Sequence, residues 1–373
     1  MWAALLMVCA ALAGAPTVDL GQSVVVADTP RLAMGGAGLA VAAGSAGLAL
    51  TPAAPEHRPS HRRESLVWDL HARAARFGWI GSDNNNLGDD HDLWVAGTWA
   101  AGIGLSSPKA GVGLLARGFT SYGLPTADTP WAERSRVYRM DVGDLRLGGA
   151  WRVGRSPITV GSGVTATAGR LGGIDELRFL AMGVSFGALL DFQAVGLHFA
   201  GVVESSQRDG NVGQASGVES VEVPARGAVG VAWASEALPT PLDRHPLLLA
   251  ADLELSSAVH NGVEPQAWMA GVNRTSGAHA TASPRFGAEI EAVPDALRLR
   301  AGTYRDPGRA SDAELRWHVT GGVELKLFHI RLRGERIPLA IRNGFDLSQR
   351  YAQVQLLGLT FWRPYRVAMA PAG

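Results

Sequence analysis

Residues Leu315–Leu327 read L-R-W-H-V-T-G-G-V-E-L-K-L, and this stretch decides the fold class. Its odd-numbered positions carry apolar side chains or glycine, whereas its even-numbered positions carry polar side chains or glycine. Such alternation is the period of a β-strand with one apolar and one polar face. At 13 residues the stretch is also about twice as long as a typical strand of a soluble domain.

The same alternation recurs along the chain from Glu64 onward. We expect fourteen such strands, near 65–77, 92–105, 110–119, 143–154, 157–169, 177–190, 192–204, 220–234, 247–259, 284–293, 296–304, 314–328, 329–337 and 351–363. Short and long links alternate between them, with an intermediate link at 235–246. An even strand number with short turns at one end is typical of an outer-membrane β-barrel. We therefore predict an all-β fold, a transmembrane antiparallel barrel of about 14 strands over residues 64–365. A barrel of about 12 or about 16 strands is the alternative.

A soluble sandwich or barrel is the alternative, since its strands alternate as well. Six tryptophans fall on the faces that we count as apolar: Trp68, Trp99, Trp151, Trp233, Trp317 and Trp362. A bilayer accepts exposed aromatic rings, which gather at its interfaces. Together with the strand length, this favours an integral protein of the outer membrane of a Gram-negative bacterium, with both termini periplasmic.

The charge balance and the N-terminus narrow the protein class further. The chain has 34 basic and 34 acidic residues, so it lacks the basic excess of a nucleic-acid binder. Residues 1–13 are apolar, and Ala11-Leu12-Ala13 has the small-x-small pattern of a signal-peptidase site. Cleavage there would remove Cys9, the sole cysteine, and with it any thiol or disulfide chemistry.

Residues 14–63 form a leader before the first strand, and Leu32–Pro55 within it carries no charge. The wording R-L-A-M-G-G-A-G-L-A-V over Arg31–Val41, followed by T-P-A at Thr51–Ala53, resembles the leader of one superfamily of barrels. It comprises FadL-type long-chain fatty-acid transporters and PorV-type secretion accessory barrels. The sequence departs from that pattern at Thr51, where the family usually has asparagine, and in a tail at 366–373 beyond the last aromatic residues.

The resemblance implies that the leader folds into the barrel lumen as a plug. The plug residues that carry the resemblance are Arg31, Met34, Gly35, Gly36, Gly38 and Pro52. Glycine suits such a segment because it lets two backbones approach closely. The alternative is a flexible periplasmic linker rich in alanine and glycine.

The polar strand faces predict a charged lumen. The expected lumen-facing residues are Asp69, Arg73, Asp144, Arg146, Arg152, Asp252, Glu254, Glu289, Glu291, Arg298, Arg300, Arg316, Glu324 and Lys326, with Glu335, Arg331 and Arg333 as further candidates. The two signs nearly balance, so we expect no selectivity for anions or cations. We expect Glu289 and Glu291 to pair across a hairpin with Arg298 and Arg300, in a salt-bridged lumen rather than a continuous apolar tunnel.

The chemical motifs are weak. Gly183–Gly187 has the spelling G-x-S-x-G around Ser185, but a nucleophile elbow needs a strand, a turn and a helix, and strand-like alternation runs straight through. Asp83, Asp89, Asp90 and Asp92 offer oxygen ligands in a loop without EF-hand spacing. His198 and His318 each stand alone on a strand, where packing or solvation is expected. We predict no enzyme activity, no catalytic residue, no cofactor and no metal.

Two functions follow from the resemblance. The first is a plugged FadL-like channel that carries small, hydrophobic molecules in or out of the cell. The second is a PorV-like barrel without transport that docks other envelope proteins for secretion, motility or surface display. In both, outer-membrane lipid and the outer-membrane assembly machinery are partners, and nucleic acid is not.

Overall fold

The structure is a computed structural model that describes most of the 373-residue chain. The described residues are 16–21, 31, 33–57, 66–79, 94–123, 138–173, 175–212, 217–235, 245–269, 274–294, 296–309, 315–332, 335–348 and 351–367. The predicted signal peptide, the aspartate-rich loop with Asp83, Asp89, Asp90 and Asp92, and the tail beyond Val367 lie outside these ranges.

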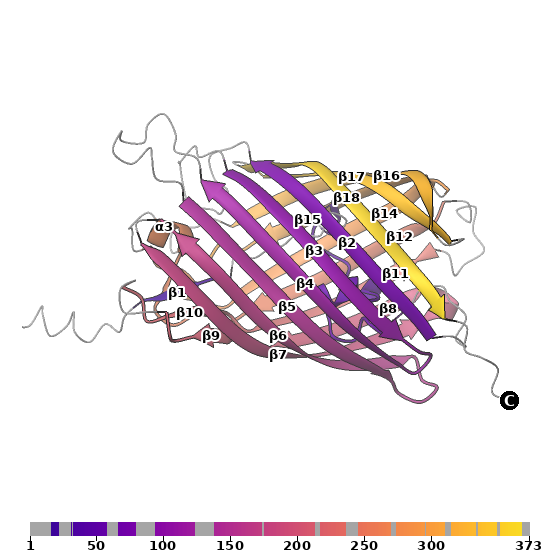
Figure 1. Cartoon of the computed structure of the whole chain (residues 1–373), viewed down its shortest axis with the longest axis horizontal. Helices are drawn as coiled ribbons and strands as arrows, with labels where there is room; N and C mark the ends of the chain where they lie inside the picture. The colour runs from indigo at the N-terminus through magenta and orange to yellow at the C-terminus, as the bar shows by residue number, and fades with distance from the viewer. Residues whose placement is uncertain are drawn as a thin grey trace, which may run out of the picture.

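Long antiparallel strands pair edge to edge into a closed barrel, which confirms the predicted fold class (Figure 1). Because β18 pairs with β2 and β8 pairs with β11, the ring of fourteen strands has no free edge. In ring order the strands are β2 (Leu66–Trp79), β3 (Trp94–Ser106), β4 (Ala110–Gly123), β5 (Tyr138–Arg152), β6 (Ile158–Gly172), β7 (Glu176–Phe192), β8 (Leu197–Glu204), β11 (Arg226–Ala234), β12 (Leu247–Ser256), β14 (Thr281–Val293), β15 (Leu297–Asp306), β16 (Arg316–Leu332), β17 (Glu335–Ser348) and β18 (Tyr351–Val367).

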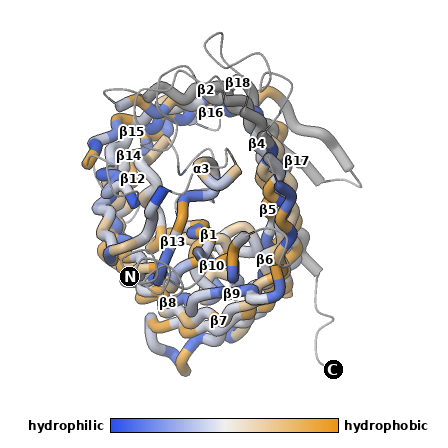
Figure 2. Tube along the Cα trace, turned by 90° about the vertical axis from the view of Figure 1, so that its left-hand side faces the viewer, coloured by the Kyte–Doolittle hydropathy of each residue, from blue (hydrophilic) through white to orange (hydrophobic). Residues whose placement is uncertain are grey.

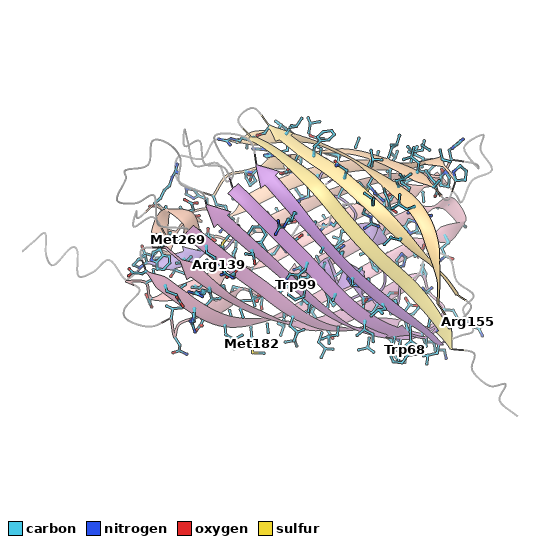
Figure 3. All side chains as sticks on the ribbon, turned by 45° about the horizontal axis from the view of Figure 1, so that its top comes forward. Trp68, Trp99, Arg139, Arg155, Met182 and Met269 are labelled. Carbon is cyan, nitrogen blue, oxygen red and sulfur yellow. The ribbon has the colours of Figure 1, made fainter. Side chains whose placement is uncertain are left out.

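The two faces of the barrel wall differ as the alternation predicts. On β7, Leu180, Met182 and Val184 are exposed on the outside, whereas Leu177 and Phe179 are buried inside. Large apolar side chains are exposed on the outer face of most strands, among them Trp68, Trp99, Trp151, Trp317, Leu147, Phe186, Val229 and Val319. Figure 3 shows Trp68 and Met182 projecting from the wall. A bilayer supplies the apolar environment that such a surface needs.

Two predicted strands are wrong in part. Residues 220–234 are not one strand, because β10 (Ser220–Val223) leaves the wall and only β11 belongs to the barrel. Residues 329–337 are not a strand either: β16 continues to Leu332, and β17 extends through the predicted link between residues 337 and 351. Register shifts at Lys326/Phe328 and Arg342/Gly344 explain the error, because a bulge breaks the period of two.

The ends of the barrel differ in the connections that they carry. The short-turn end holds the links at 107–109, 153–157, 193–196, 235–246, 294–296 and 333–334. The long-connection end holds 80–93, 124–137, 205–225, 257–280 and 307–315, but also two short links, at 173–175 and 349–350. The expected alternation of link length therefore fails after β6 and after β17.

A second, small sheet lies inside the ring at the long-connection end, and only its strand β10 falls within a predicted strand. Its order is β13 (Gly262–Val263), β1 (Thr17–Asp19), β10 and β9 (Gln207–Asp209), and β1 pairs in parallel with both neighbours. Figure 2, along the barrel, shows β1, β10, β13 and helix α3 (Pro265–Met269) within the ring. The remaining helices among the described residues are the 3-10 turns η1 (Leu39–Val41), η2 (Ala46–Ala49) and η3 (Gln193–Val195). None of the described helices combines the length and apolar character needed to cross a membrane.

The leader crosses the barrel between these two ends. Thr17 begins at the long-connection end, where it pairs with Ser220, and β2 starts at the short-turn end, where Leu66 pairs with Val367. Pro16 and Val367 therefore lie at opposite ends of the barrel. The expectation of two termini on one side counted only the barrel strands and omitted the passage through the lumen.

The outward position of Val184 gives the first prediction. Val184 lies midway along β7 and is 49% exposed. Val184→Arg should lower the free energy of unfolding in lipid vesicles by about 2–4 kcal/mol, because a charge near the bilayer midplane is poorly solvated. Val184→Leu, which keeps the face apolar, should leave the urea midpoint unchanged. Equal midpoints for both variants would mean that this face of β7 does not contact lipid.

Candidate functional site

The functional candidate is the barrel interior, which residues 33–57 of the leader fill as a plug. The plug buries its small apolar side chains against alanine, leucine and valine on the inner wall. We call this group the plug cluster; it comprises Met34, Ala37, Leu39, Ala40, Ala42, Leu48, Ala49, Leu50, Ala53, Ala54, Ala100, Leu115, Leu189, Ala200, Val202, Ala232 and Ala250. The leader is thus packed against the wall, and it is not the solvated linker of the alternative.

Glycine permits the closest contacts of plug and wall. Gly35 and Gly36 both have positive φ angles, of 64° and 77°, which side chains other than glycine rarely adopt. A Cβ atom on Gly35 would also collide with the backbone of Thr303 on β15. On the wall, Gly287 and Gly302 leave room for the backbone of Met34. The G-G pair of the leader therefore places the plug directly against β14 and β15.

Buried polar side chains on the wall accept hydrogen bonds from backbone N–H groups of the plug. Asp252 Oδ2 on β12 accepts from the backbone of Gly38 and Leu39 at 2.8 and 2.9 Å. The Gly35 N–H donates to Thr320 Oγ1 on β16 at 2.9 Å. Arg31 Nη2 lies 4.0 Å from Asp252 Oδ2. A charged acceptor shared by two N–H groups is a strong local anchor.

A serine, an aspartate and a histidine meet where the plug passes β2. They anchor the plug and do not form a catalytic triad. The backbone N–H of Ser45 donates to Asp69 Oδ2 at 2.8 Å, and its hydroxyl donates to the same oxygen. Ser45 Oγ also lies 3.0 Å from His71 Nδ1. A nucleophilic serine needs the histidine between itself and the carboxylate. Ser45 is instead bonded directly to the carboxylate and fully buried, so this contact positions the plug.

Glu56 fixes the far end of the plug near the short-turn end. Its carboxylate accepts from Arg152 Nε at 2.8 Å and Arg152 Nη2 at 3.2 Å, and from Thr159 Oγ1 at 2.7 Å. Pro52, the remaining leader residue, packs against Gly161 and Gly187 on β6 and β7. Every described segment of the plug thus has a partner on the wall.

Ion pairs form two belts around the inner wall. The first joins Asp144, Arg117, Arg146, Glu204, Arg226, Glu254 and Arg285 across β4, β5, β8, β11, β12 and β14. The second joins Glu291, Arg298, Glu289, Arg300, Glu324 and Arg342 across β14 to β17. Glu289 faces Arg300, and Glu291 faces Arg298, in direct cross-strand register.

The structure places the other expected lumen residues on the same inner face. Asp69, Asp252 and Arg316 are buried there, and Arg73, Arg152 and Lys326 are half-buried. The side chains of Arg331, Arg333 and Glu335 lie outside the described part of the chain. Arg117, Glu204, Arg226, Arg285 and Arg342 also face the lumen but were not predicted to do so. The first four lie on polar faces of predicted strands, which is the signal that would have found them, whereas Arg342 lies on β17, which was not predicted.

An apolar group lies at the long-connection end of the salt-bridged lumen, at a place that was not predicted. We call it the mouth cluster; it comprises Val18, Leu20, Phe119, Met140, Val142, Leu171, Leu177, Phe179, Val212, Val218, Val221, Val263, Trp268 and Met269. These side chains come from the inner sheet, α3 and the inner faces of β4 to β7. The assumption that polar side chains face the lumen did not mark the cluster, because the alternation of β7 is reversed near the mouth. Leu177 and Phe179 are buried inside there, whereas Glu176 and Arg178 are exposed on the outside and pair with each other.

Three sequence motifs have a definite place in the fold. Gly183–Gly187 lies inside β7, without the turn and helix of a nucleophile elbow. His318 stacks on Tyr304 with ring centroids 4.3 Å apart and bonds to Asp346 at 2.8 Å. His198, expected to stand alone, lies 3.0 Å from Asp191 and near His57 of the plug. Burial lowers the pKa of the His57 imidazole.

Several solved structures have a fold similar to that of this chain. No protein-family model matches the sequence, and no curated protein matches it. Similar solved structures include a Pseudomonas aeruginosa FadL homologue, with a TM-score of 0.57 and 12% identity over 90% of this chain and 96% of that one. The P. putida toluene transporter TodX has a TM-score of 0.55 at 12% identity, covering 92% of this chain and 99% of its own. The CymD monoaromatic hydrocarbon channel has a TM-score of 0.53 at 13% identity, covering 96% and 99%. The resemblance expected from the leader therefore holds at the level of fold: this chain is a plugged β-barrel with the architecture of FadL-type channels.

Proposed function

We propose that this protein is a plugged channel of the outer membrane of a Gram-negative bacterium and carries small hydrophobic molecules across it. The observation that carries the proposal is the plug itself, which traverses a closed barrel and is held by Asp252, Thr320, Asp69 and Arg152 of the wall. A barrel with fourteen strands lies between filled eight-stranded barrels and open porins of about 16 strands. Its lumen therefore has room for a passage once the plug is displaced.

The mouth cluster supports a hydrophobic substrate. At the long-connection end the lumen offers apolar side chains such as Phe179, Trp268 and Met269, and the charges of Asp19 and Arg309 beside them are paired with each other. Transfer of apolar surface out of water favours the binding of a small apolar molecule there by roughly 25 cal/mol per Å² buried. Beyond the mouth cluster the wall carries the two belts of ion pairs, which do not bind an apolar molecule. The apolar side chains of the plug would therefore line that part of the route through the barrel.

The comparisons favour the same substrate class. The similar structures named above are a toluene transporter and a monoaromatic hydrocarbon channel. At 12–13% identity that likeness concerns the fold, so the substrate class comes to this chain as part of the proposal. We further propose that the long connections are extracellular, as in bacterial barrels generally. The mouth cluster would then face the outside, and the proposed direction is uptake.

Loss of a plug anchor should raise the conductance. Asp252→Ala removes the acceptor of two buried N–H groups, and each group left unpaired costs about 1–3 kcal/mol. We expect the fraction of time in open states in planar bilayers to rise by about tenfold or more. The matched control is Asp209→Ala, since Asp209 also accepts two backbone N–H groups, from Leu180 and Asn211, but does not touch the plug.

Deletion of residues 32–55 tests the plug as a whole. The deleted protein should remain a heat-modifiable barrel and give a steady conductance well above wild type. A folded deletion with the conductance of wild type would show that the plug does not close the channel.

The substrate class is tested by uptake of labelled toluene into intact cells of a Gram-negative host. Expression of the protein should raise the rate of toluene entry but not that of glycerol, a polar molecule of similar size. Val18→Asp puts a charge into the mouth cluster, where Val18 is fully buried. It should lower toluene entry by about tenfold, and Val18→Ile should not.

Toluene entry equal to that of cells without the protein would contradict the transport proposal. Co-purification of a stoichiometric envelope protein, combined with that result, would favour the docking function instead.

A further inference from the structure

Three metal-ligating side chains converge where the plug meets the short-turn end of the barrel. His57 is the last described residue of the plug, Asp191 lies at the end of β7, and His198 lies at the start of β8. One ligand atom from each lies within 4.8 Å of the other two. Because η3 alone separates β7 from β8, the hairpin holds Asp191 and His198 in direct register.

The separations are close to those in a bound transition-metal site. Nδ1 of His198 lies 3.0 Å from Oδ1 of Asp191, and Nδ1 of His57 lies 4.0 Å from Oδ2 of Asp191. Ligands of a tetrahedral zinc ion, each about 2.0–2.1 Å from it, are about 3.3 Å apart. The imidazole rings of His57 and His198 stand edge to face, with centroids 6.1 Å apart.

The polar atoms at the centre of this group are buried and contact mainly one another. Oδ1 of Asp191 and Nδ1 of His198 lie 3.0 Å apart, but without the geometry of a regular hydrogen bond. The side chains of His57, Asp191 and His198 are only 4%, 5% and 14% exposed. A cation bound between these side chains would coordinate both atoms at once.

Neighbouring groups orient the ligands and leave the site with a negative charge. Gln193 Nε2 donates to Asp191 Oδ2 at 2.7 Å, as outer-shell partners of metal ligands do. The backbone N–H of His57 donates to Ala54 O at 3.0 Å, which fixes the end of the plug. Arg152 neutralises the adjacent Glu56. One uncompensated carboxylate and two imidazoles then remain to meet a divalent cation.

We propose that His57, Asp191 and His198 form a binding site for one divalent transition-metal ion of the zinc class. Two nitrogen ligands and one carboxylate suit zinc, cobalt or nickel, whereas calcium and magnesium prefer sites made entirely of oxygen. The three ligands leave the fourth tetrahedral position to water. The ion joins the plug to the β7–β8 hairpin, so it fastens the plug at the end opposite to the mouth cluster. This inference does not depend on the transport proposal.

The site is tested on the full-length protein, purified in detergent without a histidine tag and stripped with a chelator. Equilibrium dialysis against zinc chloride, with metal analysis, should give one tightly bound zinc ion per chain that excess calcium or magnesium does not displace. X-ray absorption of the zinc-loaded protein should show two imidazole ligands in a shell of nitrogen and oxygen. The absence of tight binding, or a spectrum without imidazole, would overturn the proposal whether or not any variant folds.

Variants separate this site from the other histidines of the chain. His57→Ala and His198→Ala should each weaken zinc binding by more than the roughly 10–100-fold that loss of an outer-shell partner costs, and Gln193→Ala should fall within that range. His318→Ala is the matched control, because His318 also pairs with a buried aspartate, Asp346, at 2.8 Å. Equal zinc affinity in the His57, His198 and His318 variants would place the ion elsewhere and overturn the proposal.

Discussion

The position of the plug inside the barrel depends on the hydrogen bonds of its backbone. A segment inside a barrel is shielded from water, so its N–H groups need acceptors on the wall. Asp252, Thr320 and Asp69 supply those acceptors from β12, β16 and β2. These hydrogen bonds take the place of water on the backbone of the plug and are not covalent, so the proposed displacement of the plug requires only that they break.

The wall that carries these acceptors is itself held by charge pairs. Arg146 joins Asp144 to Glu204 across the lumen-facing side of β5 and β8, and Arg300 joins Glu289 to Glu324. Each of these arginines contacts two carboxylates, so the buried charges are compensated. Breaking such a buried pair leaves an unpaired charge and is strongly destabilising. The belts therefore keep the anchors of the plug at fixed positions around the ring.

Most of the barrel could be predicted from the sequence because lipid and lumen impose opposite demands on neighbouring side chains. That demand fixes the faces of β16, where Val323 and Leu325 are exposed and Glu324 is buried. Prediction failed at β17, where bulges interrupt the alternation, and at β1, β10 and β13. These last strands are short, lie inside the barrel and pair with segments about 200 residues away, so no local pattern marks them.

The candidate site divides in the same way. The hairpin pairs Glu289–Arg300 and Glu291–Arg298 follow from sequence, because a short turn fixes their register. The contacts of the plug, the mouth cluster and the approach of His57 to Asp191 and His198 depend on the path of the leader through the barrel. The leader motif indicated a plug in the lumen, but a motif contains no information about which wall residues it meets.

A reversible cross-link between the plug and the wall tests most directly whether the plug must move for the channel to open. The Cβ of Leu39 lies 3.1 Å from the position that a Cβ on Gly230 would take, a little under the roughly 3.5–4.5 Å of a disulfide. Asp252 Oδ1 lies closer still to that position, so the Asp252 side chain must shift to admit the new side chain. In the double variant Leu39→Cys, Gly230→Cys, an oxidised cross-link would tie the plug to β11. The measurement is toluene entry into cells before and after reduction, with cross-linking verified on the same sample. If the plug gates the channel, toluene entry stops in the oxidised protein and returns on reduction. Undiminished toluene entry through a fully cross-linked protein would contradict a channel gated by the plug.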